Sequence, residues 1–379
     1  MQNFIKKSLD YLILKGFFTA KEQQFIHKKI NETEQFKYNH QYYKIINPQH
    51  IEVAYFNFLQ KAYNFNNQLY QLNKAFIHHE SGGVLINKKI FKPSFLNNFW
   101  YIISSGAYKY LFKTDKNAVE IEKGFLLTGG MTYNFYHFLI DSFPRVLDYL
   151  QLKQANPDLK LILNYPQPFT YDYLKLLDIS LSDCIFLDKN AVVKQLYISE
   201  NKHALNRPSE LYSNFIYSRQ QLRQYANFLI EKAKNQLPTT YKKGKKIYIS
   251  RYDAGTRVVS NEEELFNYLE KEGFEFVFLS KLSIPEQIQL FSESKAIVTA
   301  HGAGLANLIY AKNALIIEFF PCNKNLATLY QMHQLAQVNE NQHILFVCDQ
   351  VTELQDVRVN MQQLQQVWEA EKQANNQLK

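Results

Sequence analysis

Residues 295–318 constrain the fold of this chain most strongly, because they combine an apolar segment, a glycine turn, a short helix and a second apolar segment. Apolar and mostly β-branched residues over 296–299 are followed closely by glycines, and such a short run favours a strand of a parallel sheet. The second apolar segment ends in a carboxylate, Glu318. Strand, turn, helix and strand in this order predict an α/β fold.

The turn between these two strands, His301-Gly302-Ala303-Gly304, has the composition of a phosphate site. Gly302 and Gly304 let the backbone turn sharply and come close to a ligand. A helix that begins near Leu305 directs its free N–H groups over the turn, and such a helix start favours phosphate. Glu318 is placed to accept hydrogen bonds from ribose hydroxyls. We therefore predict a site for a nucleotide diphosphate, while a turn that serves only packing stays an alternative.

A dinucleotide site is a second alternative, because Gly302-x-Gly304 begins the Rossmann fingerprint. Asn307, however, stands where the fingerprint has its third glycine, and the acidic residue follows a shorter helix than that motif requires. The NAD alternative is therefore poorly supported.

The composition is that of a globular protein with room for more than one domain, since 46% of the 379 residues are hydrophobic and 21% are charged. The sequence contains no uncharged apolar run of about 18 residues, so we expect no membrane-spanning segment. Asp10 and Lys15 interrupt the apolar N-terminal region, which argues against a secretion signal. Cys184, Cys322 and Cys348 lie far apart without metal-like spacing and suit a reducing compartment. We predict a cytoplasmic protein.

The formal net charge of +8 indicates acidic partners, which could be nucleic acid, anionic lipid or a phosphorylated substrate. The sequence has no zinc spacing, helix-turn-helix signature or RNA-binding aromatic motif, so we expect no nucleic-acid partner. The compact basic run over 242–246 is typical of a solvated charge cluster. We predict peripheral contact with anionic lipid at the inner face of the cytoplasmic membrane.

The order of helical and strand patterns divides the chain into five parts. We predict a helical N-terminal extension over 1–75, an α/β domain over 76–206, a helical linker over 207–240, a second α/β domain over 241–350 and a C-terminal helix over 351–379. A turn and a strand are predicted within 81–87, further strands over 99–104, 124–128, 159–164, 184–187, 246–250 and 274–279, and a helix over 134–152. Ser260 with Glu263 and Ser283 with Glu286 predict capping boxes at two helix starts.

A second candidate site lies in the first α/β domain, where residues 129–144 follow a strand and open a helix. Asn134 is expected near the helix cap, and His137 and Asp141 are four residues apart and so share one helix face. A histidine at the positive end of a helix tends to stay neutral, as a general base requires. Asp141 could orient the imidazole or accept the proton itself. An ordinary capped helix with a hydrogen-bonded histidine stays an alternative.

Taken together, the two segments resemble glycosyltransferase family 61, of the type found in capsular polysaccharide biosynthesis, over about residues 75–335. The resemblance begins with Asn134, His137 and Asp141, followed by Pro144 and Arg145. Further matches are SerArg at 250–251, AsnGluGluGluLeu at 261–265, GluGlnIle at 286–288, HisGlyAlaGlyLeu-x-Asn at 301–307 and IleIleGluPhePhePro at 316–321.

The resemblance implies a GT-B architecture, in which two Rossmann-like domains face each other across a cleft, and transfer of a sugar with inversion from a nucleotide sugar. It assigns catalysis to His137 and Asp141, between which the sequence does not choose a base. The implied donor-binding residues are Asn134, Arg251, His301, Gly302, Ala303, Gly304, Asn307 and Glu318. No metal is implied, and the sequence has no Asp-x-Asp motif.

A UDP-sugar is the expected donor, and it serves as a co-substrate in place of a cofactor. The expected acceptor is a hydroxyl of a bacterial surface polysaccharide or glycolipid. Two alternatives stay open: a non-catalytic subunit that binds a nucleotide sugar or polysaccharide, and an NAD(P)-dependent enzyme that modifies sugars.

Overall fold

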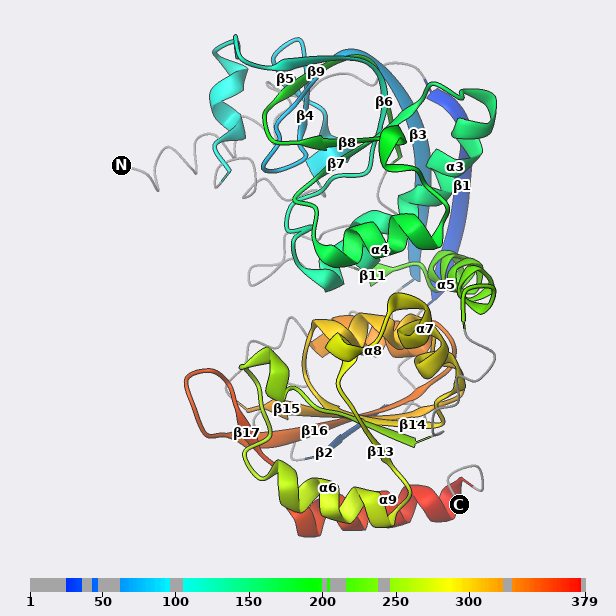
Figure 1. Cartoon of the computed structure of the whole chain (residues 1–379), viewed down its shortest axis with the longest axis vertical. Coiled ribbons are helices and arrows are strands. Elements are labelled where there is room, and N and C mark those ends of the chain that lie inside the picture. The colour runs from blue at the N-terminus through cyan, green and yellow to red at the C-terminus, as the bar shows by residue number, and fades with distance from the viewer. Residues whose placement is uncertain are drawn as a thin grey trace. The chain divides into compact units, whose positions relative to one another are not determined.

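The computed structural model describes residues 25–35, 43–46, 62–95, 105–199, 203–204, 216–237, 246–322 and 329–375. The chain forms two compact units, each built from two stretches of sequence (Figure 1). Unit 1 contains Met1–Thr33 and Asn64–Ser218, and unit 2 contains Glu34–Tyr63 and Arg219–Lys379. Both units combine helices with a mixed sheet, which confirms the predicted α/β class.

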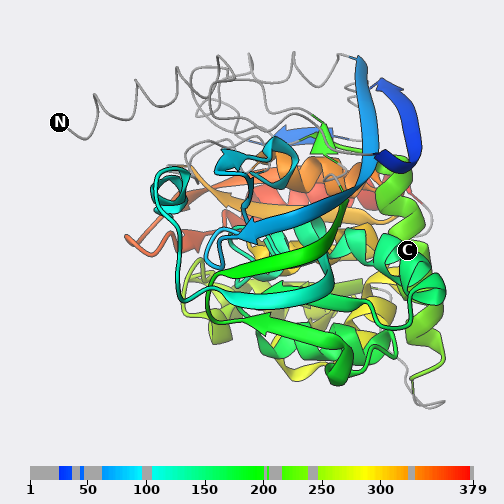
Figure 2. The same ribbon diagram turned by 90° about the horizontal axis from the view of Figure 1, so that it is seen from above.

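Unit 1 contains an eight-stranded sheet in which β6, β7, β8 and β9 pair in parallel and the remaining pairs of known direction are antiparallel. Its strands lie side by side in Figure 2. In spatial order they are β5 (Lys89–Ile90), β4 (Val84–Ile86), β3 (Ala62–Ile77), β9 (Ala191–Ser199), β6 (Val119–Leu126), β7 (Lys160–Asn164) and β8 (Cys184–Leu187), and β1 (Phe25–Gln35) also pairs with β3. A separate short pair joins β10 (His203–Ala204) to β11 (Ile216–Tyr217).

The helix predicted over 134–152 is replaced by three consecutive elements of different pitch. A π-helical turn at His137–Ser142 is followed by a 3-10 turn at Phe143–Arg145 and by α3 (Val146–Ala155). Pro144 explains the interruption, because proline has no N–H to donate and its ring crowds the preceding turn. The other helices of unit 1 are α4 (Pro168–Leu176) and 3-10 turns at Lys92–Phe95, Ala107–Leu111 and Leu181–Asp183.

Unit 2 contains a seven-stranded sheet that is parallel except at one edge. The edge strand β17 runs antiparallel to β16. The order is β13 (Glu275–Val277), β12 (Lys246–Ile249), β14 (Ala296–Ala300), β15 (Leu315–Pro321), β16 (Gln342–Gln350) and β17 (Val357–Arg358), and β2 (Tyr43–Ile46) also pairs with β16.

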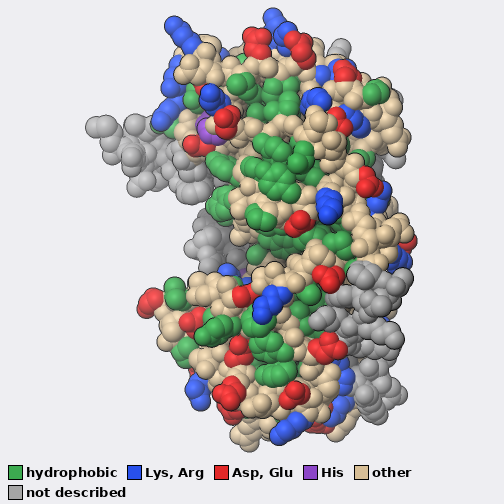
Figure 3. Space-filling model, in the orientation of Figure 1, with side chains coloured by type: hydrophobic (Ala, Val, Ile, Leu, Met, Phe, Trp, Pro, Cys, Tyr) green, Lys and Arg blue, Asp and Glu red, His purple; other side chains and the backbone are tan. Residues whose placement is uncertain are grey.

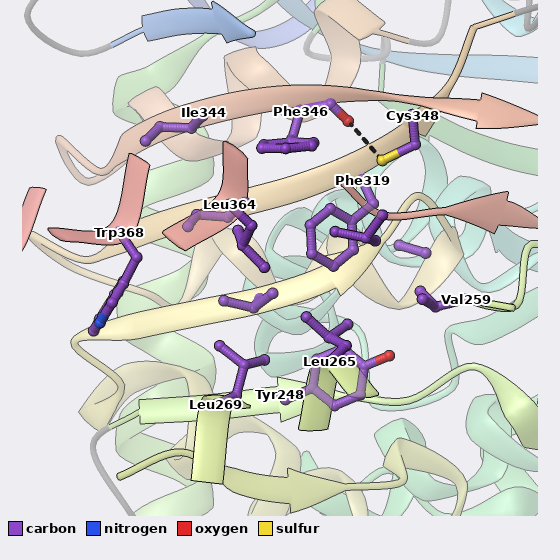
Figure 4. Packing of buried hydrophobic residues seen from close by; sticks show 14 of the residues in the cluster. Tyr248, Val259, Leu265, Leu269, Phe319, Ile344, Phe346, Cys348, Leu364 and Trp368 are labelled. Atoms are coloured by element: carbon purple, nitrogen blue, oxygen red, sulfur yellow. Dashed lines mark hydrogen bonds between the residues drawn. The ribbon is translucent and has the colours of Figure 1, made fainter. Parts of the chain in front are cut away.

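Helices cover both faces of the sheet in unit 2. Figure 1 shows α6 (Glu262–Lys271) and α9 (Met361–Ala374) on one face and α7 (Ile284–Glu293) and α8 (Leu329–Gln337) on the other, while α5 (Arg219–Lys234) packs on α7 and α8. Leu265 from α6 and Leu364 and Trp368 from α9 are buried against strand residues such as Phe319 and Phe346 (Figure 4). Each such side chain contributes about 1.5–3 kcal/mol by leaving water. Short 3-10 turns lie at Tyr252–Ala254, Leu279–Lys281 and Ala303–Ile309.

The prediction of a helical N-terminal extension over 1–75 is wrong for three segments, which form β1, β2 and β3. In β3, the buried side chains Tyr70 and Leu72 alternate with the polar residues Gln71 and Asn73, which is the period of a strand. The remaining residues of this range, 1–24, 36–42 and 47–61, lie outside the described residues.

The other predicted elements agree with the structure in part. Strands β4, β6, β7, β8, β12 and β13 confirm the predictions at their positions, whereas the strand predicted over 99–104 lies outside the described residues. The predicted linker over 207–240 contains α5, and its residues 207–215 and 238–240 are not described. The C-terminal helix predicted over 351–379 begins only at Met361, after β17, because Asn360 caps its first turn. The domain boundaries stay a prediction.

One of the two predicted capping boxes forms. The Ser283 and Glu286 side chains exchange hydrogen bonds with the backbone at the start of α7. The pair Ser260 and Glu263 does not cap α6, because the N–H of Ser260 bonds the carbonyl of Val357 and the helix starts later. Among the described residues, no helix is both long and apolar enough to cross a membrane.

Candidate active site

In unit 1, a buried arginine fixes the loop that follows β6. The guanidinium of Arg145 donates to the carbonyls of Leu127 at 2.9 Å and Thr128 at 2.8 Å, and its Nε donates to the carbonyl of Ser142 at 3.2 Å. Burial lowers the pKa of Arg145 to about 10, which leaves it cationic at neutral pH. Arg145 therefore ties the loop to the helical segment that carries His137.

His137 and Asp141 form a hydrogen-bonded pair, as their spacing predicts. Nδ1 of His137 lies 2.6 Å from Oδ2 of Asp141. The other carboxylate oxygen accepts from the hydroxyl of Tyr217 at 3.1 Å, which in turn accepts from the hydroxyl of Tyr136 at 3.0 Å. The exposed fraction is 22% for the His137 side chain and 3% for Asp141. The imidazole is thus the partner that a ligand can reach, with the carboxylate behind it.

The pKa of His137 differs from the sequence-based expectation in the direction of its shift. Burial alone would lower the pKa of His137, but the hydrogen bond and the charge of Asp141 reverse this and raise it overall. The direct contact with Asp141 therefore shifts the pKa in the direction opposite to the one expected from a helix end. With Asp141 as acceptor, Nδ1 carries the proton and Nε2 carries the lone pair in the neutral ring.

Asn134 lies where the sequence predicts it, at the start of the helical segment. Its side-chain oxygen accepts from the N–H of Tyr136 at 2.9 Å, and its carbonyl accepts from the N–H of Phe138 at 2.9 Å. Asn134 belongs to unit 1, whereas the other residues assigned to donor binding belong to unit 2.

In unit 2, a pocket of about 170 Å³ opens where the parallel strands β12 and β14 end. Ligands of open α/β sheets bind at this edge. Arg251, Gly302 and Gly304, which were assigned to donor binding from the sequence, line the pocket. Residues that were not predicted also line it, namely Ile249, Ser250, Asp253, Ala254, Leu279, Ser280, Thr299, Ala300 and Leu305.

Gly302 is required because Arg251 lies against it. A Cβ atom at position 302 would stand 1.8 Å from Nη1 of Arg251 and 2.6 Å from its Cζ. The φ of Gly302 is −178°, a conformation that any residue adopts, so the requirement is for space alone. The glycine thus lets a guanidinium lie on the backbone of the turn.

Arg251 has a second arginine near it. Burial lowers the pKa of Arg251 to about 10, and the charge of Arg257 lowers it further. Nε of Arg251 donates to the carbonyl of Thr256 at 3.3 Å. Among the described residues, neither arginine forms an ion pair with a carboxylate. The charges of Asp253 and Glu318 act on Arg251 and Arg257 respectively, but without ion pairs to them, and the guanidinium of Arg251 in the pocket favours an anion.

The turn after β14 differs from the prediction in its helix. Residues Ala303–Ile309 form a 3-10 helix rather than an α-helix that begins near Leu305. Asn307 is buried and donates to the carbonyl of Gly304 at 3.1 Å and to Oε1 of Gln287 at 3.2 Å. Asn307 therefore holds the turn against α7.

Glu318 lies inside unit 2 rather than at its surface. Strand β15 continues past it to Pro321, so the predicted strand end is wrong, and its exposed fraction is 0%. One carboxylate oxygen accepts from Nδ1 of His301, and the other accepts from Nε2 of His343 at 2.9 Å. Because both oxygens are engaged in the interior, Glu318 does not face a ligand in this structure.

The side chain of Glu318 is nevertheless ionised at neutral pH, although it is buried. Burial alone would raise its pKa, but the charges and hydrogen bonds of His301 and His343 lower it from 4.5 to about 2. A folded-state pKa below the unfolded value stabilises the fold above about pH 4.5, and this contribution is lost as the pH falls towards 2.

Glu318→Gln should therefore destabilise unit 2 by about 3 kcal/mol at pH 7, because one imidazole loses its acceptor in the interior. Urea unfolding of both proteins at several pH values would measure this difference. We expect it to shrink below about pH 4.5, as Glu318 takes up a proton in the unfolded wild-type chain. The exposed Glu353→Gln serves as the control. A difference that does not change between pH 7 and pH 3 would contradict this account.

These two sites have features typical of transferases. A partly exposed imidazole held by a buried carboxylate is typical of enzymes that remove a proton from a hydroxyl, and an arginine in a pocket at a sheet edge is typical of sites for phosphorylated ligands. Residues 135–317 match the family model Glycosyltransferase 61, which describes a family of glycosyltransferases. A search of curated proteins finds no match to the chain. The match indicates a glycosyltransferase, an enzyme that uses a sugar donor and an acceptor, and the matched range contains His137, Asp141 and the residues that line the pocket of unit 2.

Proposed function

We propose that this glycosyltransferase moves a sugar with inversion from a UDP-sugar to a hydroxyl of a bacterial surface polysaccharide or glycolipid, without a metal ion. The observation that carries the proposal is the pair of His137 and Asp141, in which only the imidazole is exposed to a ligand. The two units would form the two halves of a GT-B enzyme, with the base in unit 1 and the donor site in unit 2.

His137 would act as the base. Its Nε2 takes the proton of the acceptor hydroxyl, and the oxygen attacks the anomeric carbon from the face opposite the leaving group. The bond between that carbon and the diphosphate oxygen breaks, and its electron pair leaves with UDP. Asp141 supports this step by fixing the ring and by stabilising the imidazolium that forms.

Arg251 and Arg257 would neutralise the leaving diphosphate in place of a metal ion. Charge grows on the diphosphate as the bond breaks, and guanidinium groups that are already in place stabilise that charge. Gly302 supports this role, since it leaves room for Arg251 on the turn. We assign Glu318 and Asn307 to holding the turn, rather than to direct contact with the nucleoside.

The charge of the protein bears on the acceptor and the cellular location. Lysine and arginine side chains are interspersed with acidic ones over the face shown in Figure 3. The net charge of +8 would attract the enzyme to anionic lipid at the inner face of the cytoplasmic membrane, without a concentrated basic patch on that face.

The proposal predicts UDP binding and nucleotide release in EDTA. UDP at about 100 times its Kd should stabilise the fold by about 2.7 kcal/mol and raise the melting temperature, whereas NADH should leave it unchanged. A panel of UDP-sugars with a mixture of bacterial glycolipids and oligosaccharides should give released UDP. Stabilisation by NADH but not by UDP would support the NAD(P)-dependent alternative, and failure of every donor would contradict the proposal.

A further inference from the structure

Two tyrosines stand at the carboxyl edge of the parallel strands in unit 1. Tyr133 lies in the loop after β6 with 54% of its surface exposed, and Tyr165 follows β7 directly. Their ring centroids are 6.1 Å apart, and the rings are nearly perpendicular, at 89°. An exposed tyrosine edge-to-face with a second one presents an open aromatic surface at the edge where α/β sheets bind their ligands.

The residues that precede the two tyrosines hold each other in place. Thr132 and Asn164 are both buried, and the hydroxyl of Thr132 donates to the side-chain oxygen of Asn164 at 2.9 Å. Nδ2 of Asn164 also donates to the carbonyl of His79 at 2.9 Å. The two tyrosines therefore follow residues that are held in place, so the protein loses little conformational freedom when a ligand binds to their rings.

The backbone at this edge is also held in unfavourable conformations. Tyr165 has a φ of 47° and Met131 a φ of 67°, both in the left-handed region that non-glycine residues rarely adopt. Such residues cost on the order of 1–3 kcal/mol each and cluster at functional sites. The left-handed backbone at Tyr165 therefore fixes the direction of a partly exposed aromatic ring.

A carboxylate stands near the same surface. Burial raises the pKa of the Tyr165 hydroxyl, and the charges of Glu80 and Tyr133 raise it further, which places both groups near that hydroxyl. Glu80 is exposed and follows His79, to which Asn164 is bonded. A carboxylate beside aromatic rings offers acceptors for hydroxyl groups next to an apolar face.

We propose that Tyr133 and Tyr165 form a platform on which a pyranose ring of the acceptor saccharide stacks, with Glu80 accepting hydrogen bonds from its hydroxyls. This inference rests on the proposed function, and it states which chemical group of the acceptor binds to unit 1. A pyranose has an apolar face of C–H groups that suits the negative face of an aromatic ring, and a rim of hydroxyls that suits a carboxylate. The platform lies on the loop that leads into the His137 segment, so it serves the acceptor rather than the nucleotide.

Saturation-transfer NMR tests this platform with maltohexaose, cellohexaose and chitohexaose as probes and UDP as a separate ligand. Tyr133→Ala should reduce the saccharide signal at least fivefold, and Tyr133→Phe should keep it, because the ring remains. Tyr171→Ala is the matched control, since Tyr171 is 40% exposed in the same unit and packs on Phe186, away from the loop. The UDP signal should be equal in all four proteins.

Three results would overturn the platform: no saccharide signal with the wild-type protein, an unchanged signal in Tyr133→Ala, or a loss of the UDP signal in Tyr133→Ala. The last result would show that a nucleobase stacks on the ring instead. Equal melting temperatures of the variants would exclude a folding defect, as expected for an exposed side chain. Saccharide binding without UDP release from any donor would overturn the proposed function and leave the platform standing.

Discussion

Replacing His137 by alanine should lower kcat/KM about 10³-fold and leave the Kd for UDP unchanged. A positioned base contributes on the order of 10²- to 10⁴-fold, and His137 is the exposed partner of the pair with Asp141. The loss should appear in kcat, since the proton moves only as the acceptor oxygen attacks. Initial rates of UDP release with saturating donor and calorimetric titration with UDP would measure the two quantities.

The result separates the two classes of function that the sequence leaves open. A non-catalytic subunit would show no turnover to lose, and His137→Ala would change only its stability. His79→Ala is a suitable control, because His79 lies in the same unit and bonds Asn190 rather than Asp141. A variant of His137 with normal kcat would remove this residue as the base.

The pH profile gives an independent check on the pair. The rate should rise with pH as His137 loses its proton, and the midpoint should lie above 6.5, because Asp141 raises the pKa of the ring. Asp141→Asn removes that charge, so the rise of the rate with pH should move to lower pH. The maximal rate should also fall, because the imidazole is then a weaker base and is held less firmly. A rise that stays at the same pH in Asp141→Asn would contradict the assignment.

Local patterns predicted the parts of the fold that depend on neighbours in sequence. The strand, turn and strand over 296–321 are present because glycines and buried β-branched runs act within a few residues. The contact between His137 and Asp141 follows from helical spacing alone. Strands β9 and β16 were not predicted, although both carry apolar runs that could have revealed them.

Long-range partners account for most of what the sequence did not reveal. Tyr217 reaches Asp141 from 76 residues away, and no motif links them. Glu318 was expected at the surface, because nothing in sequence shows that His343 on the neighbouring strand β16 occupies its second oxygen. Arg257 could have been noticed as a second basic residue in the polar loop after Arg251. Burial and pairing across strands decide these roles, and they are properties of the folded chain.

Gly302→Ala should lower kcat/KM about 10²- to 10³-fold through Arg251. The added methyl group would stand 1.8 Å from Nη1 of Arg251, which must leave the turn. In other enzymes, removing one preorganised hydrogen-bond donor that stabilises negative charge in the transition state lowers the rate by about 10²- to 10³-fold. Stability should change little, because the displaced atom is the end of a flexible side chain and the backbone at position 302 is extended. UDP-release rates and urea unfolding would measure the two effects.

A double-mutant cycle distinguishes this route from a direct clash between the methyl group and the donor. If Gly302→Ala acts by displacing the guanidinium, then Gly302→Ala with Arg251→Ala should be no slower than Arg251→Ala alone, because the interaction has already been removed. Additive losses would mean that the methyl group meets the donor itself. Arg223→Ala controls for the loss of positive charge, since Arg223 lies on α5 and donates to the carbonyl of Val338. A full rate in Arg251→Ala would refute the metal-free neutralisation of the leaving group by this residue.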